Sequence, residues 1–229
     1  MTKLLFKLLI FMCVLGSTSL MAQGFSISKS SVKIEQEFVR APVFTVSRTY
    51  GKLEKNNDAG RWLQFLVSYT PVSSGKQVVW EDDLNAELIV LLPAKKGKGY
   101  GNVIMLTGKQ ILYSVPGDGK IHYLLFHIPP VVLQKYTSLV KFDTKTAGNS
   151  VYVAVVFRRG RNNQVLATGY GAMKNKSVSE IARLFEQYHN SKFRVMKLEN
   201  EILPKDRSPW QWIDTDYFDL PKSVMEGKK

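Results

Sequence analysis

The strongest constraint on the fold is a series of short apolar segments that turn-forming residues separate from one another. Alternation of apolar and polar residues is typical of a strand with one buried face, and a continuous apolar run is typical of a strand buried on both faces. Strands are predicted at 31–38, 42–46, 61–69, 86–93, 102–115, 120–128 and, as a pair, within 151–171. Glycine and proline punctuate these strands, and helices do not alternate with them, so the pattern predicts an antiparallel β-sandwich.

Two segments have helical character instead. Residues 129–138 begin with Pro-Pro and predict one or two helical turns that cross between the sheets. Residues 177–192 predict a longer helix, which a serine caps and whose apolar face holds Ile181, Leu184 and Phe185. The predicted fold class is therefore mainly β, with one or two short helices.

Residues 1–22 have the order of a secretory signal peptide. Lys3 supplies positive charge, residues 8–15 form an apolar stretch too short to span a bilayer, and small or polar residues lead up to Ala22. We therefore expect an exported protein without a transmembrane span after cleavage, located in the periplasm, on the outer surface or outside the cell. Residues 23–229 contain neither cysteine nor a flexible linker, which predicts one domain that its core stabilises without disulfides.

The charge of the chain favours anionic partners. The whole chain carries +13, and +11 remains without the two lysines of residues 1–22. Export argues against nucleic acid, which leaves sulfated or sialylated glycans, anionic lipid headgroups, acidic proteins, or a basic surface with no ligand. Two loops concentrate the basic residues, and if both lie at one end of a sandwich they form a positive rim; their candidate contact residues are Lys95, Lys96, Lys98, Arg158, Arg159 and Arg161.

The titratable residues do not form a motif for catalysis or metal binding. His122 and His127 stand an odd number of positions apart in one predicted strand, so their side chains face opposite sides and cannot share a metal ion. His189 is expected at the end of a helix, where a cation is favourable. The acidic segment 81–85 is predicted to be a solvated loop before the strand at 86–93. We therefore expect no enzymatic activity, catalytic residue, metal or cofactor.

Several stretches together resemble one family. They are VRAPVFTV, RWLQFLVSYTPV, DDLNAELIVLL, IMLTGKQILYSVPGDGKIHYLLFHIPPVVLQKY and LPKDRSPWQWIDTDYF. In this order they are similar to the pilus-associated, immunoglobulin-like (fimbrial-type) secreted proteins of verrucomicrobial gut bacteria, over roughly residues 30–218. One departure is Ser208-Pro209-Trp210, where the family usually has Thr-Pro-Phe. The resemblance implies an immunoglobulin-like sandwich and a role in pilus assembly, adhesion or host contact, together with pilus or cell-envelope partners and no catalytic residues.

Two other interpretations stay open. A periplasmic pilus chaperone is also exported, basic and immunoglobulin-like, but it would have two cores joined near residue 130. A carbohydrate-binding module would expose a platform of coplanar aromatic rings, for which four tryptophans are available: Trp62, Trp80, Trp210 and Trp212. The arrangement of the cores and of these rings therefore distinguishes the three interpretations.

Overall fold

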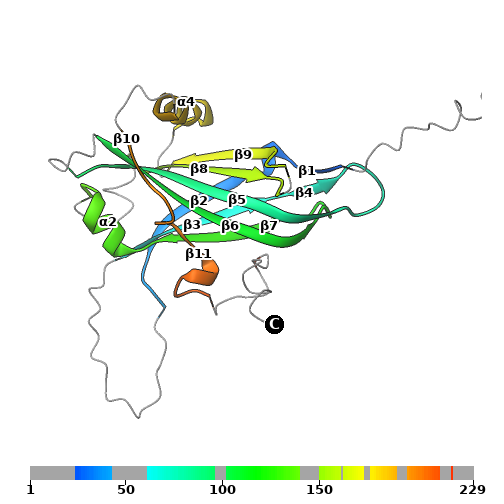
Figure 1. Ribbon diagram of the computed structural model, residues 1–229, viewed down its shortest axis with the longest axis horizontal. Coiled ribbons are helices and arrows are strands. Elements are labelled where there is room, and N and C mark those ends of the chain that lie inside the picture. Colours follow the sequence, from blue (N-terminus) through cyan, green and yellow to red (C-terminus); the bar gives the residue numbers. More distant parts are fainter. Residues whose placement is uncertain are drawn as a thin grey trace, which may run out of the picture.

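Two β-sheets stack face to face to form the body of the molecule (Figure 1). The strand order is β10-β6-β5-β8-β9 in the five-stranded sheet and β11-β7-β3-β2 in the four-stranded sheet. A third, two-stranded sheet pairs β1 with β4 at one end of the sandwich. This computed structural model describes residues 24–42, 61–95, 102–139, 150–160, 162–172, 176–189 and 195–211, together with Phe218.

The strands have the following bounds. The five-stranded sheet contains β5 (Trp80–Pro93), β6 (Val103–Pro116), β8 (Tyr152–Arg158), β9 (Val165–Ala172) and β10 (Val195–Leu198). The four-stranded sheet contains β2 (Lys33–Val39), β3 (Trp62–Tyr69), β7 (His122–Ile128) and β11 (Leu203–Pro204), and the small sheet contains β1 (Phe25–Ile27) and β4 (Pro71–Ser73). All described neighbours pair antiparallel except β10, which runs parallel to β6.

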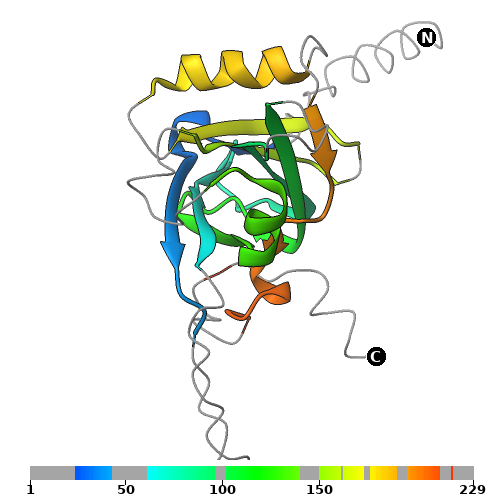
Figure 2. The ribbon, with the colours of Figure 1, turned by 90° about the vertical axis from the view of Figure 1, so that its left-hand side faces the viewer.

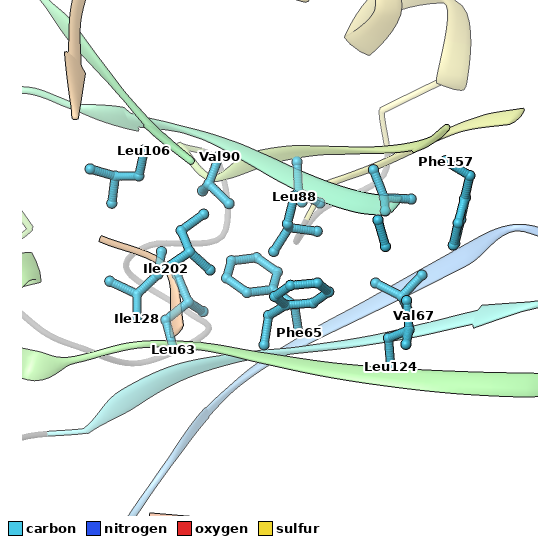
Figure 3. Close-up of a cluster of buried hydrophobic side chains, with 14 of the residues drawn as sticks. Leu63, Phe65, Val67, Leu88, Val90, Leu106, Leu124, Ile128, Phe157 and Ile202 are labelled. Carbon is cyan, nitrogen blue, oxygen red and sulfur yellow. The ribbon is translucent and has the colours of Figure 1, made fainter. Parts of the chain in front are cut away.

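The core fills the space between the two large sheets (Figure 3). Along β3, buried and half-buried residues alternate strictly, so that Leu63, Phe65 and Val67 point inward. They face inward side chains of β5 such as Leu88 and Val90, which are also fully buried. Burying each side chain of this size contributes about 1.5–3 kcal/mol. The inward-facing buried residues of both sheets form one continuous cluster.

Glycines close one side of the sandwich, where β2 lies against β9. A Cβ atom at Gly169 would collide with the side chain of Val32, and one at Gly171 would press against Ile34 and Val153. Because neither residue has a side chain, β2 of one sheet approaches β9 of the other directly. The Gly-Tyr-Gly sequence of β9 is therefore a packing requirement between the sheets.

The segment between β10 and β11 closes the opposite side. It crosses from the five-stranded to the four-stranded sheet, and the Ile202 N–H donates to the carbonyl of Thr107 at 3.3 Å. The side chain of Ile202 is almost completely buried in the core (Figure 3). A Cβ at Gly108 would collide with the backbone oxygen and Cβ of Ile202, so glycine at this position lets the crossing segment reach the core.

Two α-helices and two short 3-10 helices complete the described structure. Helix α2 (Pro130–Tyr136) leads from β7 toward the other sheet, and η1 (Lys29–Ser31) and η2 (Lys205–Arg207) are single turns. Helix α4 (Val178–His189) lies across the outer face of the five-stranded sheet (Figure 2). At its start, the hydroxyl of Ser177 accepts from the Glu180 N–H at 3.3 Å and the Glu180 carboxylate accepts from the Ser177 N–H at 3.0 Å, a capping box.

Helix α4 uses one apolar face to cover a second, smaller cluster. Ile181 and Phe185 of the helix contact outward-facing residues of the sheet, among them Leu91, Met105 and Ala154. The remaining helix residues that the structure describes are mostly exposed. The amphipathic spacing of residues 177–192 therefore reports the packing of a helix on a sheet.

The expected mainly-β sandwich with short helices is confirmed, but one local expectation is wrong. The acidic segment 81–85 lies inside β5 and not in a loop, because this strand starts at Trp80 and the Glu81 carboxylate is held by an arginine. Most of the strand expected at 42–46 falls outside the described residues.

Substituting Gly108 with alanine tests the closure by Ile202. The added methyl group has no room beside the Ile202 backbone, so we expect Gly108→Ala to lower the free energy of unfolding by about 1–3 kcal/mol. Urea denaturation measures the change. The control Val131→Ala removes two methyl groups from an exposed position of α2 and is expected to change the value by less than about 0.5 kcal/mol. Equal stabilities of the two variants would contradict the closure.

Candidate interaction surface

The basic residues predicted as contacts do not gather at one end of the sandwich. Lys95 is exposed just beyond the C-terminal end of β5. Arg158 of β8 lies opposite Asn85 in the sheet, near the other end of β5. Ten residues of extended chain separate these positions, roughly 30 Å. Lys96, Lys98 and Arg161 lie outside the described residues. The structure therefore brings Arg158 and Arg159 together and separates both from Lys95.

Both described arginines of the hairpin have carboxylate partners. Arg159 Nε donates to Glu81 Oε2 at 2.9 Å, and its Nη2 donates to the carbonyl oxygen of Phe25 at 3.1 Å. Glu81 is buried, so this ion pair joins β5, the β8–β9 hairpin and β1 in a partly dry environment. Arg158 Nε lies 3.8 Å from Glu87 Oε2 on the outer face of the sheet. These arginines stabilise the fold with their charge.

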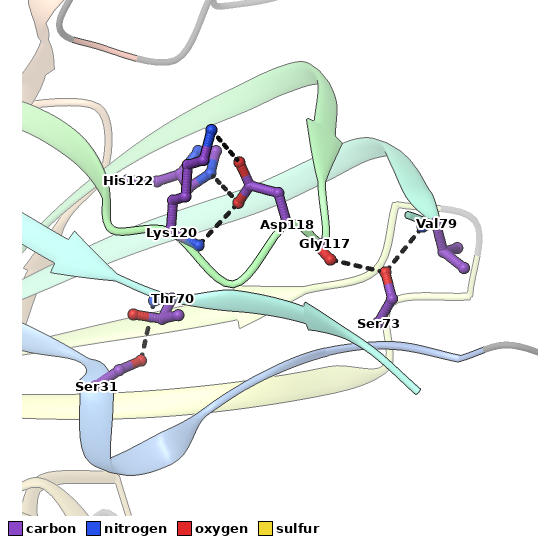
Figure 4. A network of polar contacts seen from close by, with 8 residues as sticks. All are labelled: Ser31, Thr70, Ser73, Val79, Gly117, Asp118, Lys120 and His122. Atoms are coloured by element: carbon purple, nitrogen blue, oxygen red, sulfur yellow. Dashed lines mark hydrogen bonds and ion pairs between the residues drawn. The ribbon is translucent and has the colours of Figure 1, made fainter. Parts of the chain in front are cut away.

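The turn between β6 and β7 is fixed by a polar network (Figure 4). The Ser73 hydroxyl donates to the Gly117 carbonyl and accepts from the Val79 N–H, both at 2.8 Å. Burial opposes ionisation of the Asp118 carboxyl, but its hydrogen bonds with the Lys120 N–H and His122, together with both positive charges, lower its pKa. Residues 116–119, with the sequence Pro-Gly-Asp-Gly, thus connect two strands that belong to different sheets.

The second strand histidine lies on the opposite face, as the odd spacing predicts. His127 is completely buried on the outer side of β7, where Trp210 stacks on its ring at 3.9 Å between centroids. Its Nε2 lies 3.2 Å from Gln64 Oε1, and Gln64 Nε2 donates to Glu37 at 2.9 Å. Since the amide of Gln64 donates to Glu37, its oxygen accepts from the histidine, which places the proton of neutral His127 on Nε2.

Burial makes His127 hard to protonate. Desolvation, with a smaller contribution from the nearby Lys205 ammonium, lowers its pKa from 6.5 to about 3. Protonation would place a charge under the ring of Trp210, where Nδ1 has no hydrogen-bond partner among the described residues. This histidine is therefore a structural group that anchors the C-terminal segment. The other tail tryptophan, Trp212, and the side chain of His189 lie outside the described residues.

The described residues contain no group of three or more histidine, cysteine, aspartate or glutamate side chains that could hold a metal ion. None of the helices in the described part of the chain is long and apolar enough to cross a membrane.

The surface with the clearest capacity for contact is one margin of the five-stranded sheet. Strand β10 pairs only with residues 103–106 of β6, and the Ile202 contact follows at Thr107. Beyond that point, no strand among the described residues pairs with β6 on the side away from β5. We call residues 109–113 of β6 the β6 edge.

The β6 edge presents apolar side chains to solvent. Ile111 is 38% exposed and Tyr113 is 48% exposed, and Lys109 beside them is also exposed. Trp80, at the start of β5 on the neighbouring strand, is 59% exposed. Alternation in the sequence locates this strand but does not identify its free side, because that depends on the order of strands in the sheet. Sequence reasoning therefore missed this surface.

Comparisons with known proteins match the chain over nearly its whole length. A protein-family model, whose description states no activity, ligand or partner, matches residues 20–224. A crystal structure from Akkermansia muciniphila has a TM-score of 0.62 and 15% identity, and the match covers 89% of this chain and 96% of that one. At this identity the likeness shows the fold alone.

Spo0M, a sporulation control protein from Bacillus subtilis, is a weaker structural match. It has 12% identity and a TM-score of 0.30 over 70% of this chain and 55% of its own, which is too low to carry an argument. No curated protein matches the chain.

The two adjacent arginines allow a matched test of their roles. Arg159→Met leaves the buried Glu81 carboxylate without its cation, so we expect it to lower the free energy of unfolding by about 1–3 kcal/mol. Arg158→Met removes a longer, more solvated ion pair and should cost less than about 1 kcal/mol. Urea denaturation of both variants at neutral pH measures the difference. A larger loss for Arg158→Met would contradict the assignment.

The depressed pKa of His127 predicts a dependence of stability on pH. Between pH 6.5 and about 3 the unfolded chain binds a proton at this residue and the folded chain does not, so stability is lost as the pH falls through this range. One such group contributes about 1.4 kcal/mol per pH unit. We expect His127→Gln to reduce the slope of unfolding free energy against pH by about this amount. An unchanged slope would show that His127 titrates equally in both states.

Proposed function

We propose that this chain, which belongs to the protein family whose model matches residues 20–224, acts by binding other proteins, as an exported, non-enzymatic component associated with type IV pili or fimbriae. Its role would be in pilus assembly, adhesion or host contact. The observation that carries the proposal is the β6 edge, where the exposed side chains of Ile111 and Tyr113 lie along a strand with a free side. The signal-like residues 1–22 and the resemblance to pilus-associated proteins support the cellular context.

A strand that is paired on one side only can bind another chain along its other side. Its backbone N–H and C=O groups bind an extended segment of another chain, and the side chains beside it select which segment fits. The remainder of the sandwich positions this strand rigidly, since β6 pairs with β5 from Val103 to Pro116 except at Tyr113, and both sides of the core are closed. These properties suit a protein that acts by association.

The two alternative functions have less support. A pilus chaperone with two immunoglobulin-like domains would have two cores, whereas the residues buried between the two large sheets form one cluster that runs in sequence from Phe25 to Ile202. A sugar-binding platform needs coplanar exposed rings. Trp62 and Trp210 are half-buried and meet at 78°, edge to face, which is unsuitable for stacking on a sugar.

Capture from intact cells tests the proposal. The tagged full-length chain is crosslinked in the cell envelope of its source organism, purified, and its partners are identified by mass spectrometry. We expect pilus components to be enriched with the unchanged chain. Tyr113→Asp places a charge on the β6 edge, and we expect it to reduce that recovery about tenfold, which corresponds to about 1.4 kcal/mol of binding free energy.

Val131→Asp is the matched control, because it places the same charge at another exposed position, on α2 and away from the β6 edge. We expect this variant to recover pilus components as well as the unchanged chain does. Recovery of glycans alone, or hydrolysis of a glycan by the purified protein, would contradict the proposed function.

A further inference from the structure

The β6 edge has a regular set of backbone hydrogen-bonding groups for which the described residues provide no partner. The Thr107 carbonyl points away from β5, because it accepts the N–H of Ile202. The backbone N–H and C=O groups of alternate residues in an antiparallel strand point to the same side. The groups of Lys109, Ile111 and Tyr113 therefore point away from β5 as well, and no described strand pairs with them.

Little in this part of the chain protects the edge from association. Proteins blunt free edges with prolines, bulges, inward-pointing charges or covering helices. Residues 109–113 contain no proline, and Lys109 to Leu112 pair regularly with Glu87 to Leu84 of β5. Asp83, opposite Tyr113, has a positive φ of 59°, and the pairing resumes in the same register at Ser114. Helix α4 covers the sheet around Leu91 and Met105, toward the other end of the strands. Lys109 is the one charged side chain of the edge.

The side-chain order of the edge is complementary to itself. If two copies meet antiparallel about a two-fold axis at Ile111, each Ile111 faces its equivalent and each Lys109 faces Tyr113 of the partner subunit. Cross-strand pairs of apolar residues stabilise a sheet, and a lysine is favourable over a tyrosine ring. The two lysines do not face each other, so the arrangement avoids repulsion between like charges in a strongly basic chain.

The hydrogen-bonding pattern agrees with this register. Residues 109, 111 and 113 are those whose backbone groups point to the free side, and the two-fold axis pairs them only with one another. We propose that two copies of this chain associate through antiparallel pairing of their β6 edges, which joins the two five-stranded sheets into one continuous sheet. This inference rests on the proposed use of the β6 edge as an interaction surface, and it names a second copy as the partner.

A designed disulfide tests the register. Across an antiparallel hydrogen-bonded pair the Cα atoms lie about 5.5 Å apart, within the range of about 4.4–6.8 Å that a disulfide spans. In the full chain with Cys13→Ser, which removes the one native cysteine, Ile111→Cys is expected to form a covalent dimer on mild oxidation. A mixture of Lys109→Cys and Tyr113→Cys chains should form the mixed dimer in preference to either homodimer.

The control for this experiment is Val131→Cys in the same background, an exposed position on α2 that lies outside the pairing. We expect it to remain largely monomeric under the oxidation that links Ile111→Cys. Equal crosslinking of the two variants, or homodimers of Tyr113→Cys in excess of the mixed dimer, would overturn the proposed register.

Sedimentation of the unmodified chain tests the association without relying on any variant. We expect the dimer fraction to rise with protein concentration, and Ile111→Lys, which sets two like charges opposite each other, to weaken the dimer at least about tenfold. A chain that stays monomeric up to about 1 mM overturns the inference. If such a monomer still captures pilus components, the proposed function stands without the dimer; if a dimer forms and no component is captured, the dimer stands alone.

Discussion

The insertion of Ile202 between the sheets is the contact on which the rest of the structure depends. A sandwich of two sheets leaves both sides of its core open to water unless some element crosses between them. On this side the crossing segment runs directly over Gly108, and the buried isoleucine fills the space between β6 and the four-stranded sheet. On the other side Gly169 and Gly171 let β2 reach β9. Glycine residues therefore determine where segments of the two sheets can approach each other closely.

The two arginines that the sequence suggested as ligand contacts form ion pairs within the fold instead. Arg159 is held by the buried Glu81 carboxylate and a backbone carbonyl, and Arg158 pairs with Glu87 on the surface of the sheet. His127, the most buried titratable group of the outer face, stays neutral beneath Trp210. The surface available for contact is instead a strand margin with a tyrosine and an isoleucine, where backbone groups supply the polarity.

Local periodicity in the sequence correctly predicted most of the strands and the long helix. It did not predict which of these elements lie next to one another in the fold. The alternation in 61–69, the hairpin in 151–171 and the helix after Ser177 all correspond to observed elements, because each pattern records which side chains one segment buries. The parallel pairing of β10 and the role of Ile202 depend on contacts between distant segments, which no local pattern contains. The same reason explains why the β6 edge was missed and why Glu81 was expected in a loop.

The position of Ile202 along the chain has a consequence for the order of folding. It comes later in the sequence than every other residue of the main core cluster. A chain that emerges N-terminus first can therefore pair β2 with β3 and β5 with β6 before Ile202 is available. At that stage one side of its core is still exposed to solvent. The last piece of the core arrives only after both long strands and helix α4 have been delivered. Until then the polypeptide lacks the contact that closes this side of its core.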